Sequence, residues 1–349
     1  MGGEGGPGVT NFAGVRLIAA AMVVVGHSFV LTGAVPPSLL GTPVHVLAVR
    51  VFFVISGYLV CGSWLRDPAM HRFLLRRALR IMPGLVAVVL GGVLVGAAMT
   101  TLPVGAFMAH PQTVEYLWNL VLSPRFALPG VFDDGRAFTA VNGSLWSLPV
   151  EVAMYLLLPL YAGRWRVAAL VVPAVTAAVV FTVVWPGQIA PVLFATSIPF
   201  GLRFAADFVV GAGVRVWRLE RRLSLQVALL GLAVAQAGAV SAVGGAVLSG
   251  VALPYAVLAF CLAGRPVFGR LEGRADLSYG VYLWAGPVQQ GVLSLVGAGV
   301  GWGGLTVLAG PVILGMAAVS WYGVERPALR WKPGSRDVTG LQNRTASSR

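Results

Sequence analysis

Two ionisable residues of one apolar segment, Arg16 and His27, have a spacing that places them on the same side of a helix. They lie eleven positions apart in GVRLIAAAMVVVGHSF, residues 14–29. At 100° per residue this is three turns plus about 20°, and at 1.5 Å per residue it is roughly 16 Å along the axis. Hydrocarbon does not solvate such groups, so we expect them to face a bundle interior or a water-filled cavity and to mark function.

Two further ionisable residues lie at similar depths in other apolar segments. Arg50 lies in VRVFFVISGYLV, and Glu151 follows Trp146 in SLWSLPVEVAMYLLLP. Three such groups are costly in a membrane unless they meet each other or a polar ligand. A histidine that titrates near pH 7 and is oriented by a carboxylate can remove the proton of a hydroxyl group. The alternative for His27 is a hydrogen-bonded residue of helix packing.

Closely spaced arginines precede the third apolar segment. Arg72, Arg76 and Arg80 recur every four residues, and Arg77 and Arg80 form an R-x-x-R pair. Neighbouring guanidinium groups bind phosphates bidentately, and Arg16 can join such a site. The alternative is ordinary anchoring at the cytoplasmic surface of a membrane.

The remaining ionisable residues of the apolar segments have simpler interpretations. Arg203 and Asp207 are spaced i, i+4, which predicts a structural salt bridge or a supporting role behind the residues of the site. Three histidines at loops or span ends are expected to be incidental: His45, His71 and His110.

The elements that must position these residues are membrane helices. The chain has 349 residues, of which 57% are hydrophobic and only 11% charged. Its mean hydropathy is +0.83. Soluble domains carry about 25% charged residues, so the composition indicates a polytopic membrane protein. The net charge of +13 lies in short tracts between apolar spans and without a recognition motif, which argues against nucleic-acid binding.

Apolar runs of about 20 residues predict an all-α bundle of about ten transmembrane helices. The expected spans are 13–33, 44–65, 81–102, 144–163, 167–185, 197–214, 223–241, 244–263, 277–297 and 304–323. Arginines fill alternate connections and the C-terminal end, which predicts that both termini are cytoplasmic. The intervening loop 103–143 has room for a short helix near 114–122. Residues 1–332 are expected to form one membrane domain, and 333–349 a polar, disordered tail.

No motif for a metal, nucleotide hydrolysis or a serine triad is present, and Cys61 and Cys261 form no spacing motif. In contrast, several segments follow one another in the order seen in a known family. They are R-x10-H at 16–27, FFVISGYLV at 52–60, RRALRIMP at 76–83, WSLPVE at 146–151 with Tyr155, LSYGVYLW at 277–284 and SWYGVERPALR at 320–330. The chain resembles the membrane-bound acyltransferase 3 family, whose bacterial members O-acylate surface glycans, lipid-linked sugars and some antibiotics.

The resemblance implies an acyl-CoA donor, expected to be acetyl-CoA, that enters from the cytoplasmic side, and no permanently bound cofactor. The family's catalytic histidine corresponds to His27, its R-x-x-R to Arg77 and Arg80, and its acidic residue to Glu151. We expect Arg16 to join the donor-binding arginines. Residues expected to bind the acceptor or acyl group are Arg50, Trp146 and Tyr155.

The expected function is an O-acyltransferase of the plasma membrane that acts on a hydroxyl of a carbohydrate or a glycosylated or secondary metabolite. His27 would serve as general base, oriented by a partner such as Glu151, or as a transient acyl carrier. The bilayer is the other expected partner, and no feature of the sequence indicates an oligomeric state. The alternatives are a transporter or flippase for a lipid-linked or glycan precursor, and a non-catalytic membrane scaffold.

Overall fold

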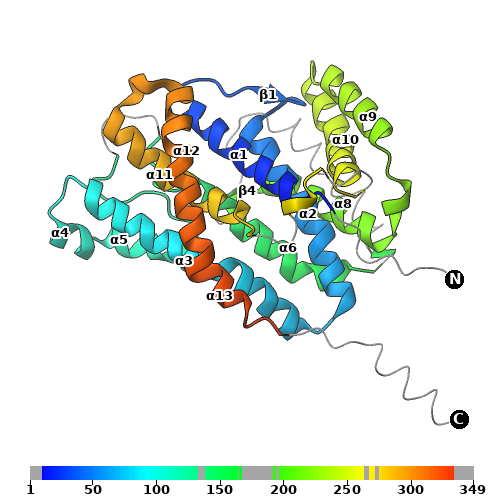
Figure 1. Ribbon diagram of the computed structural model, residues 1–349, viewed down its shortest axis with the longest axis horizontal. Helices are drawn as coiled ribbons and strands as arrows, with labels where there is room; N and C mark the ends of the chain where they lie inside the picture. Colours follow the sequence, from blue (N-terminus) through cyan, green and yellow to red (C-terminus); the bar gives the residue numbers. More distant parts are fainter. Residues whose placement is uncertain are drawn as a thin grey trace, which may run out of the picture.

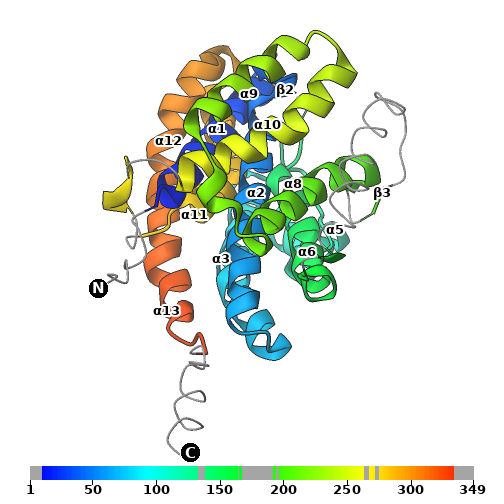
Figure 2. The same ribbon diagram turned by 90° about the vertical axis from the view of Figure 1, so that its right-hand side faces the viewer.

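The computed structural model describes residues 10–132, 138–163, 165–166, 192–193, 196–262, 267–271 and 275–333. These residues are mostly helical (Figures 1 and 2). The long helices are α1 (Phe12–Leu31), α2 (Val44–Arg66), α3 (Met70–Met99), α6 (Ser147–Tyr161), α8 (Ile198–Val216), α9 (Leu225–Gly238), α10 (Ala242–Leu262), α11 (Ser278–Val296) and α12 (Gly301–Ser320). Shorter helical segments are α4 (Val104–Ala109), α5 (Pro111–Tyr116), η1 (Leu117–Val121), η2 (Gly143–Trp146), η3 (Leu219–Arg222), η4 (Gly269–Leu271), η5 (Ala298–Val300), η6 (Trp321–Glu325) and α13 (Arg326–Leu329).

Six segments within the described part of the chain are long and apolar enough to cross a membrane. They are Phe12–Leu31, Val44–Arg66, Met70–Met99, Gly143–Tyr161, Val243–Leu262 and Gly301–Leu329. This confirms the all-helical membrane class. Helices α8, α9 and α11 coincide with three further expected spans, but α9 has only 14 residues, and the expected span 167–185 lies outside the described residues. The number ten and the cytoplasmic termini therefore stay predictions, as does the disorder of the tail, which is described only to residue 333.

Helix α2 packs against α1, α8 and α10, and its contact with α8 is close enough to bring the two backbones together. A Cβ at Gly57 of α2 would lie 2.0 Å from the carbonyl oxygen of Phe208, and a Cβ at Gly211 of α8 would lie 2.3 Å from that of Val54. Small residues permit this approach of membrane helices. The consequence is that side chains of α2 and α8 interact deep inside the bundle.

Two helices differ from the predicted boundaries at the end of the molecule where positive charge gathers. Helix α3 begins at Met70 rather than at 81, so its arginines are helical; Asp67 accepts hydrogen bonds from Arg72 and Arg76 and supports the first turns. The last expected span ends at residue 323. Instead α12 continues through the π-helical turn η6 into α13, where Pro327 occupies the first turn and needs no amide donor.

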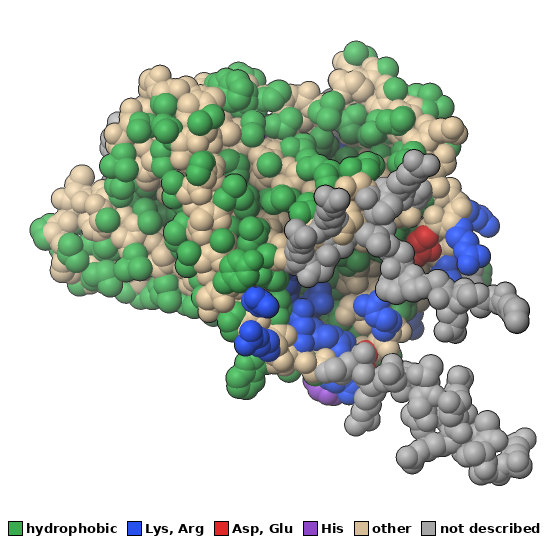
Figure 3. Space-filling view, in the orientation of Figure 1, with side chains coloured by type: hydrophobic (Ala, Val, Ile, Leu, Met, Phe, Trp, Pro, Cys, Tyr) green, Lys and Arg blue, Asp and Glu red, His purple; other side chains and the backbone are tan. Residues whose placement is uncertain are grey.

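Lysine and arginine gather at one end of the face shown in Figure 3, around the start of α3 and α13, while α4 and α5 lie at the other end (Figure 1). This agrees with the alternation of arginine along the sequence. The short helix expected near 114–122 is present as α5 and η1.

Two short hairpins complete the described fold. Strand β1 (Ser38–Leu39) pairs with β2 (Thr42–Pro43), and β3 (Val192–Leu193) pairs with β4 (Thr196–Ser197). The first hairpin turns at Leu40 and Gly41, both at positive φ, and delivers the chain to the start of α2.

Candidate active site

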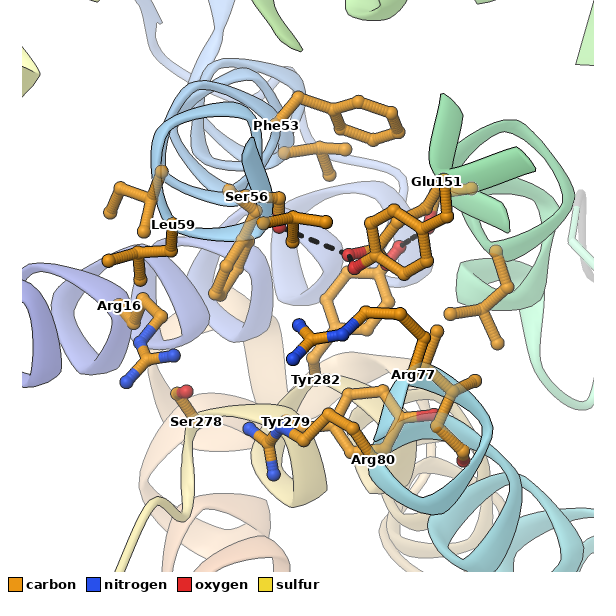
Figure 4. A pocket seen from close by; sticks show the side chains of 18 residues that line it. Arg16, Phe53, Ser56, Leu59, Arg77, Arg80, Glu151, Ser278, Tyr279 and Tyr282 are labelled. Carbon is orange, nitrogen blue, oxygen red and sulfur yellow. Dashed lines mark hydrogen bonds between the residues drawn. The ribbon is translucent and has the colours of Figure 1, made fainter. Parts of the chain in front are cut away.

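A cavity of about 120 Å³ opens among α1, α2, α3, α6 and α11 (Figure 4). Its polar lining comes from segments far apart in the sequence: Arg16, Ser56, Arg77, Arg80, Ser147, Glu151, Tyr155, Ser278, Tyr279 and Tyr282. Its apolar lining comes mainly from α2, including Phe52 and Phe53. The three arginines expected to bind the donor, and two of the residues expected to act on or bind substrate, Glu151 and Tyr155, therefore share one cavity. We call it the arginine cavity.

Two of the cavity's arginines share a carboxylate that the sequence interpretation missed. Asp276 accepts from Arg80 at 2.6 Å and lies 3.2 Å from Arg16, so it links α3 to α1. Glu325 lies 3.6 Å from Arg80 on the other side. Burial raises the pKa of Asp276, but Arg80, Arg16 and the hydrogen bonds from Ser278 together more than offset this, so that its pKa lies below its usual value. The only signal in the sequence was a lone acidic residue just before LSYGVYLW.

Arg77 differs from the other arginines of this end. Within the described residues it has no carboxylate within ion-pair distance, which Arg16, Arg72, Arg76 and Arg80 all have. Its Nε is buried without a hydrogen-bond acceptor, as are those of Arg16 and Arg76. In contrast, Arg72 and Arg76 both pair with Asp67, whose pKa their hydrogen bonds hold far below its usual range. The interpretation of Arg72 and Arg76 as membrane-surface residues therefore fits their geometry better than a phosphate site does. Arg77 keeps an unused donor at the cavity wall.

Glu151 lies deep in the arginine cavity and joins α6 to α2. Its Oε1 accepts a hydrogen bond from Ser56 at 3.1 Å and a short one from Tyr155, one helical turn away (Figure 4). The guanidinium carbon of Arg77 lies 6.0 Å from the centre of the Tyr155 ring. These contacts hold a carboxylate, two hydroxyl groups and a cation together.

His27 lies elsewhere. It lines a small cavity with Gly143, Gly286 and Gln290, among others, and its ring centre is 5.5 Å from that of His45. This small cavity shares Phe138, Ala140 and Gly143 with a larger cleft of about 290 Å³, to which Trp146 and Phe200 contribute aromatic surface. We call the two together the outer cleft, since they lie toward the end of α1 away from Arg16.

A hydrogen-bonded wall separates the arginine cavity from the outer cleft. The Tyr282 hydroxyl donates to the Ser144 carbonyl at 2.8 Å and lies 2.7 Å from Ser147 Oγ. The Tyr282 ring packs edge-on against Phe52, with ring centres 5.9 Å apart. Tyr282 and Ser147 face the arginine cavity, and the adjacent Trp146 faces the outer cleft. Glu151 and His27 line different cavities, and the hydrogen bonds given for Glu151 go to Ser56 and Tyr155, so the orientation of His27 by Glu151 stays a prediction.

Arg50 also has a partner other than the one expected. Its guanidinium donates to both oxygens of Asp207, at 2.8 and 3.1 Å, and to Ser249 of α10. It does not line either cavity. The predicted pair of Arg203 with Asp207 gives way to this one, and Arg203 donates instead to Thr42 at 2.9 Å. Helix packing brings Arg50 against Asp207 because the α2–α8 contact is so close.

A helical membrane bundle with an arginine-lined cavity fits a membrane-embedded enzyme that takes an anionic substrate. The chain belongs to the acyltransferase 3 family, since the model of its acyltransferase domain matches residues 9–324. It is therefore a membrane enzyme that transfers acyl groups other than amino-acyl groups, and the transporter and scaffold alternatives fall away.

Two relatives match over nearly their whole length. An O-acetyl transferase of Shigella phage Sf6 is 28% identical over 327 residues, which cover 90% of this chain and 94% of that protein. Nodulation protein 10 of Rhizobium leguminosarum bv. viciae is 28% identical over 355 residues, which cover 92% and 93%. No solved structure matches the chain.

Proposed function

We propose that this O-acyltransferase moves an acetyl group from acetyl-CoA to a hydroxyl of a carbohydrate, or of a glycosylated or secondary metabolite, at the plasma membrane. The assignment of acetyl-CoA as the donor is supported by Arg77. This residue lines the arginine cavity, and its buried Nε has no hydrogen-bond acceptor. A buried donor without a partner costs about 1–3 kcal/mol, and a phosphate oxygen would remove that cost. Arg16 and Arg80 lie at the same cavity and, held by Asp276, offer their remaining N–H groups.

The chemistry requires the thioester to leave the arginine cavity. The acyl-pantetheine arm would pass Tyr282 and place its thioester carbonyl near His27, which lines the outer cleft. His27 then takes the proton of the acceptor hydroxyl, whose oxygen attacks the thioester carbon as the C–S bond breaks. The alternative route forms an acyl-histidine first and passes the acyl group to the acceptor in a second step.

Glu151 takes a different role from the one expected of a partner of His27. Its carboxylate fixes the hydroxyl groups of Ser56 and Tyr155 at the inner side of the wall. These groups are placed to contact the pantetheine amides or the thioester on its way through the cavity. Glu151 is thus a residue of the donor path.

The acceptor belongs in the outer cleft. Trp146 stands there with Phe200, ring centres 4.9 Å apart, and offers the kind of apolar face that covers a sugar ring. The name O-acetyl transferase borne by the phage relative supports acetyl as the group transferred.

Two variants of the full chain test the proposal in cells. Mass spectrometry of surface glycans and secreted metabolites, with and without the gene, identifies the product by its lost acetyl mass. His27→Ala should abolish that mass at wild-type protein level, and Arg77→Gln should strongly reduce it, whereas the control Arg72→Gln should not. Product formation by His27→Ala would refute the assignment of His27.

The two chemical routes differ in what accumulates without acceptor. Purified protein in proteoliposomes is incubated with radiolabelled acetyl-CoA and digested. An acetylated peptide containing His27 supports the relay, and its persistent absence while transfer proceeds supports direct attack.

A further inference from the structure

We infer that His45 is the positioning partner of His27, the role that sequence reasoning had assigned to Glu151. The inference rests on the proposed function of His27. The two imidazole rings have centres 5.5 Å apart and an angle of 50° between their planes. At this separation their nitrogens can meet through a direct hydrogen bond or through one water.

The second observation concerns a ring nitrogen of His45 and its hydrogen bonding. His45 Nδ1 is buried and has no hydrogen-bond partner among the described residues. Buried polar groups in proteins are nearly always satisfied, so an orphaned ring nitrogen beside a reactive residue calls for an explanation. An N–H of His27, presented when the site is engaged, would satisfy it.

The third observation is the packing that brings the rings together. His45 stands on the second residue of α2, directly over Gly26 of α1. A Cβ at Gly26 would lie 2.6 Å from the His45 Cβ and 2.9 Å from its Nδ1. Only glycine allows this approach, next in sequence to His27 itself. The absence of a side chain at Gly26 therefore allows His45 to lie beside His27.

The other ionisable groups on the elements around this end of α2 have partners of their own. Arg50 pairs with Asp207, Arg203 donates to Thr42, Arg16 pairs with Asp276, and Glu151 accepts from Ser56 and Tyr155. Among the residues that the structure describes, His45 is therefore the ionisable group whose ring lies against that of His27.

The proposed roles of the two histidines follow from where the protons lie during acyl transfer. Neutral His45 accepts the N–H of His27, which fixes the tautomer and leaves the other His27 nitrogen free as a base. The acceptor O–H proton moves to that nitrogen, the oxygen bonds the acyl carbon, and the C–S bond breaks. The proton on His27 then passes to the CoA thiolate, so the products are ester and free thiol. His45 itself touches no reacting atom.

The test measures the reactivity of His27 without any acceptor. Diethyl pyrocarbonate carbethoxylates neutral imidazole, and peptide mass spectrometry reports its rate at His27 in proteoliposomes of the full chain from pH 5 to 8. His45→Leu removes the hydrogen-bond acceptor, whereas His45→Asn replaces it with an amide oxygen near the position of Nδ1. Gly26→Ala keeps both histidines and pushes them apart. His71→Gln, on the exposed start of α3, is the matched control.

We expect His45→Leu and Gly26→Ala to slow carbethoxylation of His27 by about 10- to 100-fold, the usual effect of losing an orienting partner. His45→Asn should stay within about threefold of wild type at pH 8, where both histidines are neutral. Toward the acid end, the wild-type rate should fall more steeply with decreasing pH than the His45→Asn rate. Both histidines must be neutral in wild type, whereas only His27 must be neutral in the variant.

A His45→Leu protein whose His27 reacts at the wild-type rate and with the wild-type pH profile would overturn the inference. If His45→Leu does not fold, an unchanged acid slope in His45→Asn overturns it instead. Failure of the proposed function gives another pattern: His27→Ala still makes product while carbethoxylation of His27 continues to depend on His45.

Discussion

Asp207→Asn removes one partner of the most deeply buried ion pair that the structure describes. The side chains of Arg50 and Asp207 are 2% and 3% exposed, and their two hydrogen bonds are 2.8 and 3.1 Å long. After the substitution only neutral oxygens surround the guanidinium charge: those of Ser249, at 3.1 Å each, and the amide oxygen of the new asparagine. Breaking a buried pair by removing one partner costs about 3–5 kcal/mol, because the other charge is left uncompensated.

The double variant Arg50→Met with Asp207→Leu should recover most of that loss. Replacing a whole buried pair by apolar residues of similar volume is often neutral or stabilising by about 1–4 kcal/mol. At about 2 °C per kcal/mol, thermal unfolding in detergent should begin about 6–10 °C lower for Asp207→Asn and near the wild-type temperature for the double variant. Tryptophan fluorescence or light scattering on heating measures this.

The double variant also decides what Arg50 does. A structural pair predicts that the stable double variant keeps acyl transfer and donor affinity near wild type, since Arg50 lines neither cavity. If the double variant is stable but inactive, Arg50 serves the substrate, as its place in the sequence first indicated. Single substitutions whose losses simply add would refute the coupling of the two charges.

Three further outcomes are expected. Arg77→Gln should weaken CoA binding in nanodiscs by about 10- to 150-fold, the equivalent of losing one charge-assisted contact of about 1.5–3 kcal/mol. The control Arg72→Gln should change the affinity by less than about threefold, and equal affinities of the two variants would contradict the donor site. Desolvation by the surrounding protein, followed by neighbouring arginines including Arg77, lowers the pKa of Lys332 to about 8. Lys332 therefore loses its charge as the pH rises through 8, so the KM for acetyl-CoA should rise above pH 8 in wild type but not in Lys332→Arg, as initial rates would show. Gly57→Ala would place a Cβ 2.0 Å from a backbone oxygen of α8 and should lower the unfolding temperature or abolish folding, whereas Gly310→Ala, with open space around it, should do neither.

The sequence by itself determined the class of the protein and the residues worth examining. Long apolar runs and the placement of arginine are local properties, and hydrocarbon imposes them directly on the chain. The same locality explains why Arg16 and His27 could be placed on one face of α1, and why the R-x-x-R and WSLPVE motifs led to the arginine cavity that Arg77 and Glu151 share.

Only the tertiary structure decided which of these residues meet. Partners such as Arg50 with Asp207, Arg80 with Asp276 and His27 with His45 lie on different helices, and their encounter depends on how closely the backbones approach. Glycines at a few contact points set those approaches, and no periodicity within one helix encodes them.

The separation of His27 from Glu151 has the same origin. Both lie on predicted helices at similar depths, so the sequence favoured a direct pair. In the structure they line different cavities, and Tyr282, hydrogen-bonded to residues 144 and 147, lines the cavity of Glu151. The position of a residue along a helix can be predicted from the sequence, because each residue adds a constant rise. The cavity that a side chain lines depends on how the helices pack. Packing therefore places His27 and Glu151 in two cavities instead of the one site expected.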